Sequence, residues 1–425
     1  MSLARTQIDR VWTELGLITG HDYVRPASRE DAVDGMEPCG VIAPGTPQEV
    51  AQVLHYCSSA GLALIVRGGG TKLEQGNRPA KVDFILSTER LSRVVEHAWD
   101  DMTATVEAGC IIANFQDTLR QHGQRLAADP RQPERATVGG VLATAESGTL
   151  RIRYGGIRDL VLGLEMALPD GSIIRPGGKV VKNVAGYDLT KLAIGSLGTL
   201  GVITQVVFRL YPVPFSSATY SATVSSVADA MKMTLAILDS HLVYTGLQIR
   251  AQRADQIAID VRFEGIAESL EDQFAKLGQV AGPDRFKESA AEVWQARSEL
   301  LVDAASAVIC KARVLPAQIG SLCEMVFCQA EMLGVAATLV AQATGLAEVR
   351  LEGGSAGACA TLVRALRGEL SGLDGVVTVE RCPVAMKPEL DLWGSGRETV
   401  PLMRQIKAKF DPANVLNPGR FLGGI

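Results

Sequence analysis

A run of glycines directly after an apolar segment is the first place where this sequence could do chemistry. Residues 62–66, Leu-Ala-Leu-Ile-Val, are predicted to form a short buried strand, and three consecutive glycines, residues 68–70, follow it. Glycines in a row cost backbone entropy and are expected where the main chain takes positive φ or approaches another group closely. Successive peptide N–H groups in such a turn can hold a phosphate or a pyrophosphate. A tight surface turn is the alternative for this stretch taken alone.

The spacing of these glycines excludes two common nucleotide sites. The segment lacks the Gly-x-x-x-x-Gly-Lys-Ser/Thr pattern, so it is not a P-loop for ATP. It also lacks a Gly-x-Gly-x-x-Gly pattern that opens a helix in a β-α-β unit, so an ordinary dinucleotide-binding fold is not expected.

Four later stretches extend the pattern. Residues 136–144 contain Gly139 and Gly140, and Ser147-Gly148 and Arg153-Tyr154-Gly155 follow. Residues 182–192 read Lys-Asn-Val-Ala-Gly-Tyr-Asp-Leu-Thr-Lys-Leu, and residues 195–204 read Gly-Ser-Leu-Gly-Thr-Leu-Gly-Val-Ile-Thr. The tail carries Phe-Asp-Pro at 410–412 and Leu-Asn-Pro-Gly-Arg at 416–420. Together with residues 67–72, these stretches resemble, in this order, the FAD-binding domain of the p-cresol methylhydroxylase and vanillyl-alcohol oxidase superfamily, over roughly residues 40–213 and 386–425.

The resemblance implies an FAD site. The backbone of residues 67–72 would cradle the pyrophosphate, and Gly139, Gly140 and Thr144 would line the flavin side, with Thr137 as helix cap and hydrogen-bond donor. A helix N-terminus without bulky side chains brings unpaired N–H groups to an anion, which agrees with this assignment. Residues 201–203 would meet the adenine end through the main chain of an edge strand, and the tail would return towards the flavin ring. The implied cofactor-binding residues are Arg67, Gly68, Gly69, Gly70, Thr71, Lys72, Pro130, Thr137, Gly139, Gly140, Thr144, Ser147, Gly148, Arg153, Gly155, Gly201, Val202, Ile203, Asn417 and Arg420.

The residue types also bear on how FAD is held. Many members of the superfamily tether the flavin through a histidine, often at the position that Thr71 occupies here. Cys110 occurs further along, but a lone buried cysteine is more often a core residue than a linkage. We therefore expect dissociable, non-covalent FAD.

Composition limits the other possibilities. A chain of 425 residues predicts two or three domains with ample core. The net charge of 42 − 47 = −5, without a basic block, argues against nucleic-acid binding. Charged residues near the N-terminus argue against a signal peptide, and the longest uncharged run, residues 332–347, is too short and too mixed to span a bilayer. We expect a cytoplasmic protein, which partners could hold at the inner membrane.

The eight cysteines are scattered and form no Cys-x-x-Cys pair. Iron–sulfur clusters and structural zinc sites need clustered or paired ligands, so neither is expected. Buried, reduced thiols are the simplest interpretation.

The predicted fold class is α+β, with a two-lobed FAD-binding domain of the p-cresol methylhydroxylase (PCMH) type plus a ferredoxin-like α/β cap domain. Residues 1–38 read as an N-terminal appendage with a helix, residues 39–213 as the FAD-binding domain, and residues 386–425 as a segment that returns to it through a helix at 401–410. In the domain, strands are predicted at 41–43, 82–86, 104–107, 160–168 and 202–210. Helices are predicted after the N-cap Thr46, at 114–121 and from 137.

Residues 215–385 repeat one order of elements. Strand 219–224, helix 227–242, strands 245–251 and 256–263 and helix 268–277 form the first set. After a helical link at 290–305 come strand 307–314, helix 319–333, strands 336–342 and 347–351, helix 358–370 and strand 376–380. Two split β-α-β units in tandem predict the ferredoxin-like cap.

A closer resemblance connects two motifs, residues 68–72 and 182–188, with the smaller FAD-binding subunits of bacterial glycolate oxidases. These subunits work beside a larger FAD-binding catalytic subunit and an iron–sulfur subunit. The larger subunits carry a His-rich metal motif in the cap and a His-Gly pair near the C-terminus. The five histidines here end at His241, so the later cap and the tail have no imidazole, and no metal site is expected.

Oxidation of an α-hydroxy acid needs a base for the hydroxyl proton and a cation for the carboxylate. Lys311 and Arg313 alternate onto one face of a cap strand, and Arg350 shares a face with Glu352. These cations could hold a carboxylate, or they could be solvated strand charges. Glu352, Glu380 and Tyr187 are alternatives for a base, and the catalytic residue stays unassigned.

Three functions remain open. The first is an FAD-binding subunit of a glycolate (2-hydroxy-acid) oxidase or dehydrogenase that passes electrons to a partner subunit. The second is a stand-alone FAD-dependent dehydrogenase with a base other than histidine. The third is a non-catalytic structural flavoprotein subunit.

Overall fold

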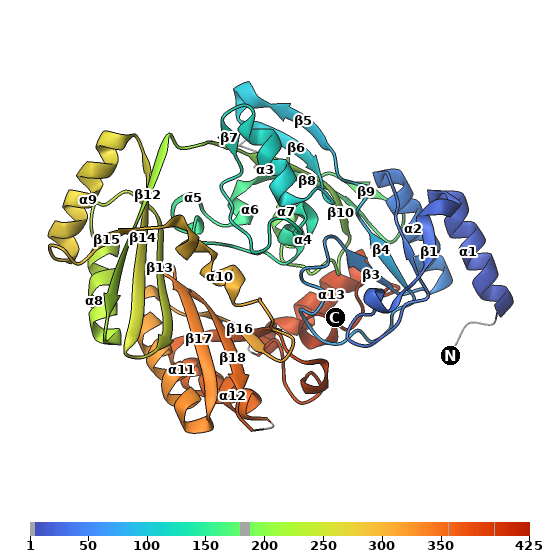
Figure 1. The fold of residues 1–425 in the computed structure, drawn as a ribbon. Coiled ribbons are helices and arrows are strands. Elements are labelled where there is room, and N and C mark those ends of the chain that lie inside the picture. Colours follow the sequence, from blue (N-terminus) through green and yellow to red (C-terminus); the bar gives the residue numbers. More distant parts are fainter. Residues whose placement is uncertain (1–4, 179–187, 356, 395) are drawn as a thin grey trace. The chain divides into compact units, whose positions relative to one another are not determined.

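The computed structural model describes residues 5–178, 188–355, 357–394 and 396–425. The chain forms two compact units (Figure 1): unit 1 comprises residues 1–146, 156–212 and 396–425, and unit 2 comprises residues 147–155 and 213–395. The break at 212/213 lies next to the predicted end of the FAD-binding domain at residue 213. Residues 5–38 belong to unit 1 and do not form a separate appendage. Residues 147–155 belong to unit 2, although the sequence assigned them to the FAD-binding domain. Residues 396–425, within the C-terminal segment predicted at 386–425, belong to unit 1.

The first sheet of unit 1 is a four-stranded, mostly parallel sheet in the order β1-β2-β4-β3. Its strands are β1 (Val24–Pro26), β2 (Gly40–Ile42), β3 (Leu64–Arg67) and β4 (Phe84–Ser87), and β1 alone runs antiparallel. Helices α1 (Arg5–Thr19) and α2 (Pro47–Ala60) pack beside them. The predicted start of α2 is confirmed: Thr46 accepts a hydrogen bond from the Glu49 amide, and Gly61 ends the helix at φ 64°.

The N-terminal helix is part of this core. Val11 and Leu15 of α1 are buried in the same hydrophobic cluster as Val50 and Leu54 of α2. Because both helices bury an apolar stripe against the sheet, α1 is an integral layer of unit 1.

The second sheet of unit 1 has five strands in the order β5-β6-β10-β8-β9, all antiparallel. The strands are β5 (Val94–Ala98), β6 (Thr103–Glu107), β8 (Val161–Ala167), β9 (Ile173–Ile174) and β10 (Val202–Arg209), and β7 (Gln124–Arg125) pairs with β11 (Tyr211–Pro212). The helices are α3 (Ile112–Arg120), α4 (Val138–Ala143), α6 (Ile157–Leu160), α7 (Leu189–Ala193) and α13 (Val400–Phe410). Phe115 and Leu119 of α3 are fully buried.

Unit 2 is one eight-stranded sheet in the order β15-β12-β14-β13-β17-β18-β16-β19. Its first half consists of β12 (Ser216–Val224), α8 (Val227–Leu238), β13 (Tyr244–Arg253), β14 (Gln256–Gly265), α9 (Ala267–Ala281) and β15 (Lys287–Ser289). The second half consists of β16 (Val308–Arg313), α11 (Ile319–Leu333), β17 (Val335–Gln342), β18 (Leu346–Gly353), α12 (Ala358–Leu370) and β19 (Val376–Arg381). A short 3₁₀ turn, Ala291–Gln295, and α10 (Ala296–Glu299) link the halves, and α5 (Arg151–Tyr154) also lies in this unit.

The predicted duplication is visible in this topology. Each half has the order β-α-β-β-α-β, and antiparallel pairing of β13 with β17 joins the two halves into one sheet. Helix α8 ends at Leu238 rather than at 242, and the Ser240 hydroxyl donates to the Ile237 carbonyl of its last turn. The sequence pattern did not predict β15, a short and mostly exposed edge strand.

The two faces of the sheet in unit 2 differ in chemistry. Helices α8, α9, α11 and α12 line one face (Figure 1), and apolar residues such as Ile249, Ile259 and Leu339 form the core beneath them. The alternate residues on the other face include Gln248 and Gln342, which lie opposite each other on β13 and β17. Both are buried, so the middle of this polar face is covered.

Candidate cofactor site

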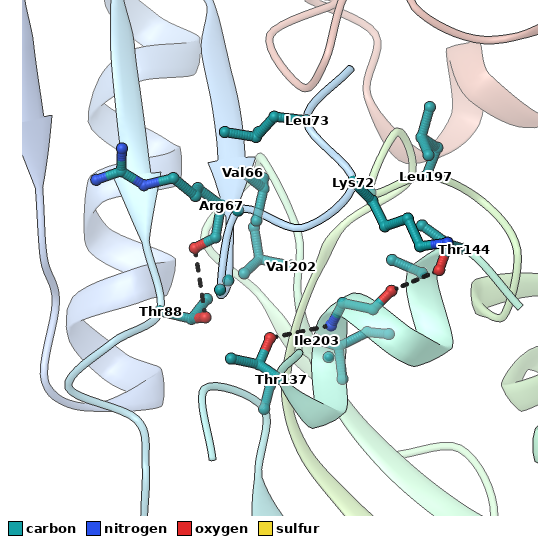
Figure 2. Close-up of a pocket in the computed structure, with 18 of the residues that line it drawn as sticks. Val66, Arg67, Lys72, Leu73, Thr88, Thr137, Thr144, Leu197, Val202 and Ile203 are labelled. Carbon is teal, nitrogen blue, oxygen red and sulfur yellow. Dashed lines mark hydrogen bonds between the residues drawn. The ribbon is translucent and has the colours of Figure 1, made fainter. Parts of the chain in front are cut away.

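One pocket of unit 1 collects residues from most of the glycine-rich stretches. It encloses about 740 Å³, part of it open to solvent. Figure 2 shows the turn after β3 on one side and helix α4 on the other. The lining residues are Val66, Arg67, Gly68, Gly69, Gly70, Thr71, Lys72, Leu73, Thr88, Ala108, Thr137, Gly139, Gly140, Ala143, Thr144, Leu197, Gly198, Gly201, Val202, Ile203 and Arg420.

The turn after β3 presents unused backbone donors to this pocket. None of the hydrogen bonds within the described residues uses the amide N–H of Gly68, Gly69, Gly70 or Thr71. Backbone donors left without a partner are uncommon in folded proteins, and consecutive ones form a concave site for an anion. The turn therefore has the donor set that a pyrophosphate needs.

Glycine is required in this turn for two different reasons. A Cβ atom on Gly68 would overlap the Thr137 hydroxyl, and one on Gly69 would overlap the carbonyl oxygen of Arg135. Gly70 has a φ of +74°, which side-chain-bearing residues rarely adopt. The turn thus packs directly against the segment that leads into α4, and this contact forms the pocket.

The two basic side chains of the turn are engaged by acids of unit 1. Arg67 Nη1 lies 2.7 Å from Asp31 Oδ1, and its guanidinium points away from Thr137 and Thr144 (Figure 2). Hydrogen bonds, first from Arg25 and then from Ser28 and Arg67, hold the pKa of Asp31 far below its usual range. Lys72 Nζ lies 3.3 Å from Glu146 Oε2. The anion-binding capacity of the turn therefore rests on its backbone more than on these two side chains.

Helix α4 forms the opposite wall. Thr137 is its N-cap, as predicted: the hydroxyl accepts a hydrogen bond from the Gly140 amide at 3.4 Å, and its own proton can still be donated to a ligand. Gly139 packs on Ala108, where a Cβ atom would come within 2.8 Å of the alanine methyl group. The Thr144 hydroxyl donates to the Gly140 carbonyl at 2.8 Å and ends the helix (Figure 2). This wall therefore has no bulky side chain at Gly139 and Gly140, and the hydroxyls of Thr137 and Thr144 lie at the two ends of the helix.

The C-terminal tail braces the pocket from behind. Asn417 Nδ2 donates to the carbonyls of Leu197 and Gly198 at 3.1 and 3.0 Å, and its backbone has a φ of 46°. Arg420 is 3% exposed and donates to the carbonyls of Leu73 and Gln75, and burial lowers the pKa of its guanidinium to about 10. Asn417 holds the Leu197–Gly198 loop without lining the pocket, whereas Arg420 lines the pocket and holds the segment after the glycine turn.

A buried ion pair fixes the base of this tail. Lys407 Nζ donates to Asp411 Oδ2 at 2.6 Å and to the carbonyls of Thr199 and Leu416. Asp411 accepts the amides of Val415 and Leu416. The Phe-Asp-Pro part of the closing signature is thus a structural clamp for the segment that carries Asn417 and Arg420.

The predicted site residues fall into three groups. Lining the pocket are residues 67–72, Thr137, Gly139, Gly140, Thr144, residues 201–203 and Arg420. Asn417 lies behind it, as described above. Pro130 in unit 1 and Ser147, Gly148, Arg153 and Gly155 in unit 2 are not among its lining residues.

Sequence reasoning missed seven lining residues: Val66, Leu73, Thr88, Ala108, Ala143, Leu197 and Gly198. Leu197 and Gly198 lie inside a stretch already singled out for its glycines, which was the available signal. Ala108 and Thr88 have no such signal, because they reach the pocket only through the pairing of distant strands.

The description of residues 201–203 as part of an edge strand is wrong. β10 lies between β6 and β8 in the five-stranded sheet. Its pairing with β6 begins only at Gln205, so Val202 and Ile203 extend beyond the end of that neighbour. The pocket uses this projecting start of an interior strand.

Four of the candidate substrate-binding and catalytic residues of unit 2, Arg350, Glu352, Lys311 and Glu380, already contact other groups of the protein. Arg350 donates to Glu352 at 2.6 Å and to the carbonyls of Leu300, Val302 and Asp303, so it supports the linker between the two halves. Lys311 Nζ lies 3.9 Å from the buried Glu380. Arg313 is exposed, and Tyr187 lies outside the described residues.

Cys110 has the properties of a core thiol. It is 3% exposed, it does not line the pocket, and burial raises its pKa to about 11. Thr71, in contrast, lies in the pocket. The described residues contain no helix that is both long and apolar enough to cross a membrane.

Comparisons with known proteins agree with this geometry. Residues 38–177 match the model of the FAD binding domain, and residues 386–421 match that of the C-terminal domain of FAD-linked oxidases. The chain is 28% identical to the glycolate oxidase subunit GlcD of Bacillus subtilis over 90% of this chain and 88% of that protein. It is 29% identical to a D-lactate dehydrogenase of Archaeoglobus fulgidus over 89% and 90% of the two chains. The solved structure of p-cresol methylhydroxylase superposes with a TM-score of 0.75 at 14% identity, covering 99% and 97% of the two chains, and confirms the fold.

Proposed function

Because the chain is an FAD-linked oxidoreductase with a PCMH-type fold, we propose that it is the FAD-binding subunit of a 2-hydroxy-acid dehydrogenase, with glycolate as the first substrate to test. The proposal includes a larger FAD-binding catalytic subunit and an iron–sulfur subunit as partners. The observation that supports the cofactor site most strongly is the row of unused amides at Gly68–Thr71, set against the N-terminus of α4.

These residues fit FAD in both charge and shape. The amides would hold the pyrophosphate, and the absence of side chains at 68–70 lets the anion approach the main chain. When bound, FAD supplies the two-electron acceptor for the oxidised carbon. The protein contributes the anion site, the glycines of α4 that leave room for the cofactor, and the Lys407–Asp411 ion pair that holds the tail.

The cofactor is proposed to be held without a covalent bond. Thr71, at the pocket wall, has a hydroxyl group of low nucleophilicity. The Cys110 thiol stays protonated near neutral pH, since its pKa is about 11, and a protonated thiol is a poor nucleophile.

The residue types at the pocket support the proposal that partner subunits take part in the reaction. Its lining residues include no carboxylate and no imidazole, so none of them can act as a general base for a hydroxyl proton near neutral pH. A partner that supplies the base, and another that takes the electrons away, would complete the reaction. This favours a subunit of a complex over a self-sufficient enzyme.

A stand-alone dehydrogenase is the second candidate, and Glu380 is the observation that favours it. This carboxylate is buried on the polar face of unit 2, with Lys311 at 3.9 Å. A buried carboxylate next to one cation could accept a proton while the cation attracts a substrate carboxylate. A structural subunit that binds FAD loosely is the third alternative.

The test is an anaerobic titration of the purified chain with glycolate, with and without the co-purified partners. We expect the flavin absorbance to stay constant with the chain alone and to bleach when the partners are present. Bleaching of the isolated chain, abolished in Glu380→Gln, would support the stand-alone enzyme instead. Absence of bleaching in the intact complex, with D-lactate tested as well, would refute a 2-hydroxy-acid dehydrogenase.

A further inference from the structure

Three charged side chains of unit 1 meet at one end of the cofactor pocket. Glu146 and Arg131 are 4% and 3% exposed, and Glu146 Oε1 accepts the Arg131 amide at 3.0 Å and its Nε at 2.9 Å. The other carboxylate oxygen, Oε2, lies 3.3 Å from the Lys72 ammonium. Of the three, Lys72 is the one that lines the pocket. Because two cations share one carboxylate, these side chains sum to one positive charge, with Lys72 on the pocket side.

The Lys72 ammonium lies towards the end of helix α4 that is remote from the glycine turn. The turn meets the helix at its N-terminus, where Gly68 packs against the Thr137 hydroxyl. Glu146 follows the other end, whose C-cap is Thr144. A helix of six residues is about 9 Å long, at about 1.5 Å per residue. Because its ammonium pairs with Glu146, the Lys72 side chain extends away from the amide row and towards Thr144 (Figure 2).

The two ends of α4 border different parts of the pocket. At the N-terminal end, Gly139 packs on Ala108, and the Ala108 amide donates to the carbonyl of Thr204, directly after residues 201–203, where the adenine is expected. At the C-terminal end, the Leu197 amide donates to the last carbonyl of the helix. FAD extends from its pyrophosphate to the adenine in one direction and to the flavin ring in the other. With the adenine near the N-terminus of α4, the end that carries Lys72 is left for the ring.

We propose that the Lys72 ammonium stabilises the negative charge that the flavin ring acquires on reduction, and that Glu146 offsets part of this effect from behind. The inference rests on the proposed function, in which a 2-hydroxy acid reduces the ring. The ring takes two electrons and one proton from the oxidised carbon, the hydroxyl proton goes to the base, and the neutral ring becomes an anion. A positive charge in a partly enclosed pocket favours that anion, because solvent screens it less than at an open surface. Glu146 acts through Lys72 and is a positioning residue.

The reduction potential separates this role from binding of the pyrophosphate. The potential of the bound cofactor depends on the ratio of the dissociation constants of its oxidised and reduced forms. Removal of a lysine that contacts only the pyrophosphate would weaken both forms equally and leave the potential unchanged. Removal of a lysine at the ring weakens mainly the reduced form and therefore lowers the potential.

The test is the midpoint potential of bound FAD, measured by anaerobic titration with dithionite beside a reference dye. We expect Lys72→Met to lower it by at least about 30 mV, which is tenfold in the equilibrium constant of a two-electron couple. Lys72→Arg keeps the charge and should change that constant by less than about twofold. Glu146→Gln keeps the shape but removes the negative charge behind the ammonium, so the potential should rise. Lys409→Met, at an exposed position of α13 outside the pocket, is the control and should leave the potential unchanged.

Two results would overturn the proposal. An unchanged potential in Lys72→Met, with both forms of FAD bound more weakly, would assign the ammonium to the pyrophosphate. A potential in Lys72→Arg as low as in Lys72→Met would show that the fit of the side chain matters and its charge does not. A fall of the potential in Glu146→Gln would contradict the part given to Glu146.

The outcome does not depend on a single variant or on the substrate. Lys72→Met and Glu146→Gln predict shifts of opposite sign, so if one of them loses its flavin, the other decides. Dithionite takes the place of the hydroxy acid in this titration. Failure of glycolate to reduce the chain would therefore contradict the proposed substrate but would leave the measured potentials intact.

Discussion

A charge placed at Thr71 gives the sharpest test of the pyrophosphate site. Thr71 lines the pocket next to the unused amides of the glycine turn. Thr71→Asp and Thr71→Asn introduce side chains of the same shape that differ by one negative charge. The ratio of their dissociation constants for FAD therefore isolates electrostatics from steric effects.

The magnitude follows from Coulomb's law. At a separation of roughly 5 Å and an effective dielectric constant of about 20, two unit charges of like sign repel by about 3 kcal/mol. That energy corresponds to about a hundredfold in the dissociation constant. Because the pocket is partly open, solvent and salt screen part of this repulsion. We expect Thr71→Asp to bind FAD between about tenfold and a hundredfold more weakly than Thr71→Asn.

The assay is titration of the FAD-free protein by quenching of flavin fluorescence, at low and at high salt. The ratio between the variants should shrink as salt rises. Riboflavin has no pyrophosphate and serves as the control ligand, so the two variants should bind it equally. Equal affinities for FAD, or an equal loss for riboflavin, would refute the assignment of the turn to the pyrophosphate.

Three further predictions concern the frame of the site and the cofactor linkage. Lys407→Met leaves the buried Asp411 carboxylate without its cation and should lower the free energy of unfolding, measured by urea denaturation, by about 3–5 kcal/mol. The control Lys409→Met, at an exposed position of the same helix, should change it by no more than about 0.5 kcal/mol. Equal losses in the two variants would contradict the structural role of the Lys407–Asp411 ion pair. The folded pKa of Asp31 lies far below its unfolded value of about 3.9, so its contribution is fully present above about pH 5 and is lost as pH falls through the acid range. The loss of thermal stability in Asp31→Asn should therefore be the same at about pH 6 and about pH 8 and smaller at about pH 3, and a loss that varies between pH 6 and 8 would contradict this ion pair. Denaturation of the holoprotein should release all yellow colour into the supernatant, and flavin left on the polypeptide would contradict non-covalent binding.

Local signals predicted much of the fold. The helix bounds of α11 and α12 match the structure residue for residue, because each has a continuous apolar stripe and lies between two apolar strands. The repeated order of elements in unit 2 was predictable from the sequence alone, because the spacing of apolar residues alternates between strand and helix periodicity. The ends of α8 and the existence of β15 could not, since they depend on single hydrogen bonds and on pairing at a sheet edge.

The candidate site was predictable to the extent that it consists of glycines. The glycines of the turn at 68–70 and of the wall at 139–140 are recognisable in the sequence, and they are needed because any side chain there would meet a neighbour or fill the pocket. Ala108 and Thr88 contribute by position only, so no residue type marks them. The place of residues 147–155 in unit 2 depends on contacts such as Tyr154 with Glu264, which are distant in sequence.

The most direct test of the account is a crystal structure of the chain with FAD bound. The account predicts pyrophosphate oxygens within hydrogen-bonding distance, about 2.7–3.2 Å, of the amide nitrogens of Gly68–Thr71, with the flavin beside α4. A pyrophosphate bound elsewhere, with these four amides still without partners, would contradict it.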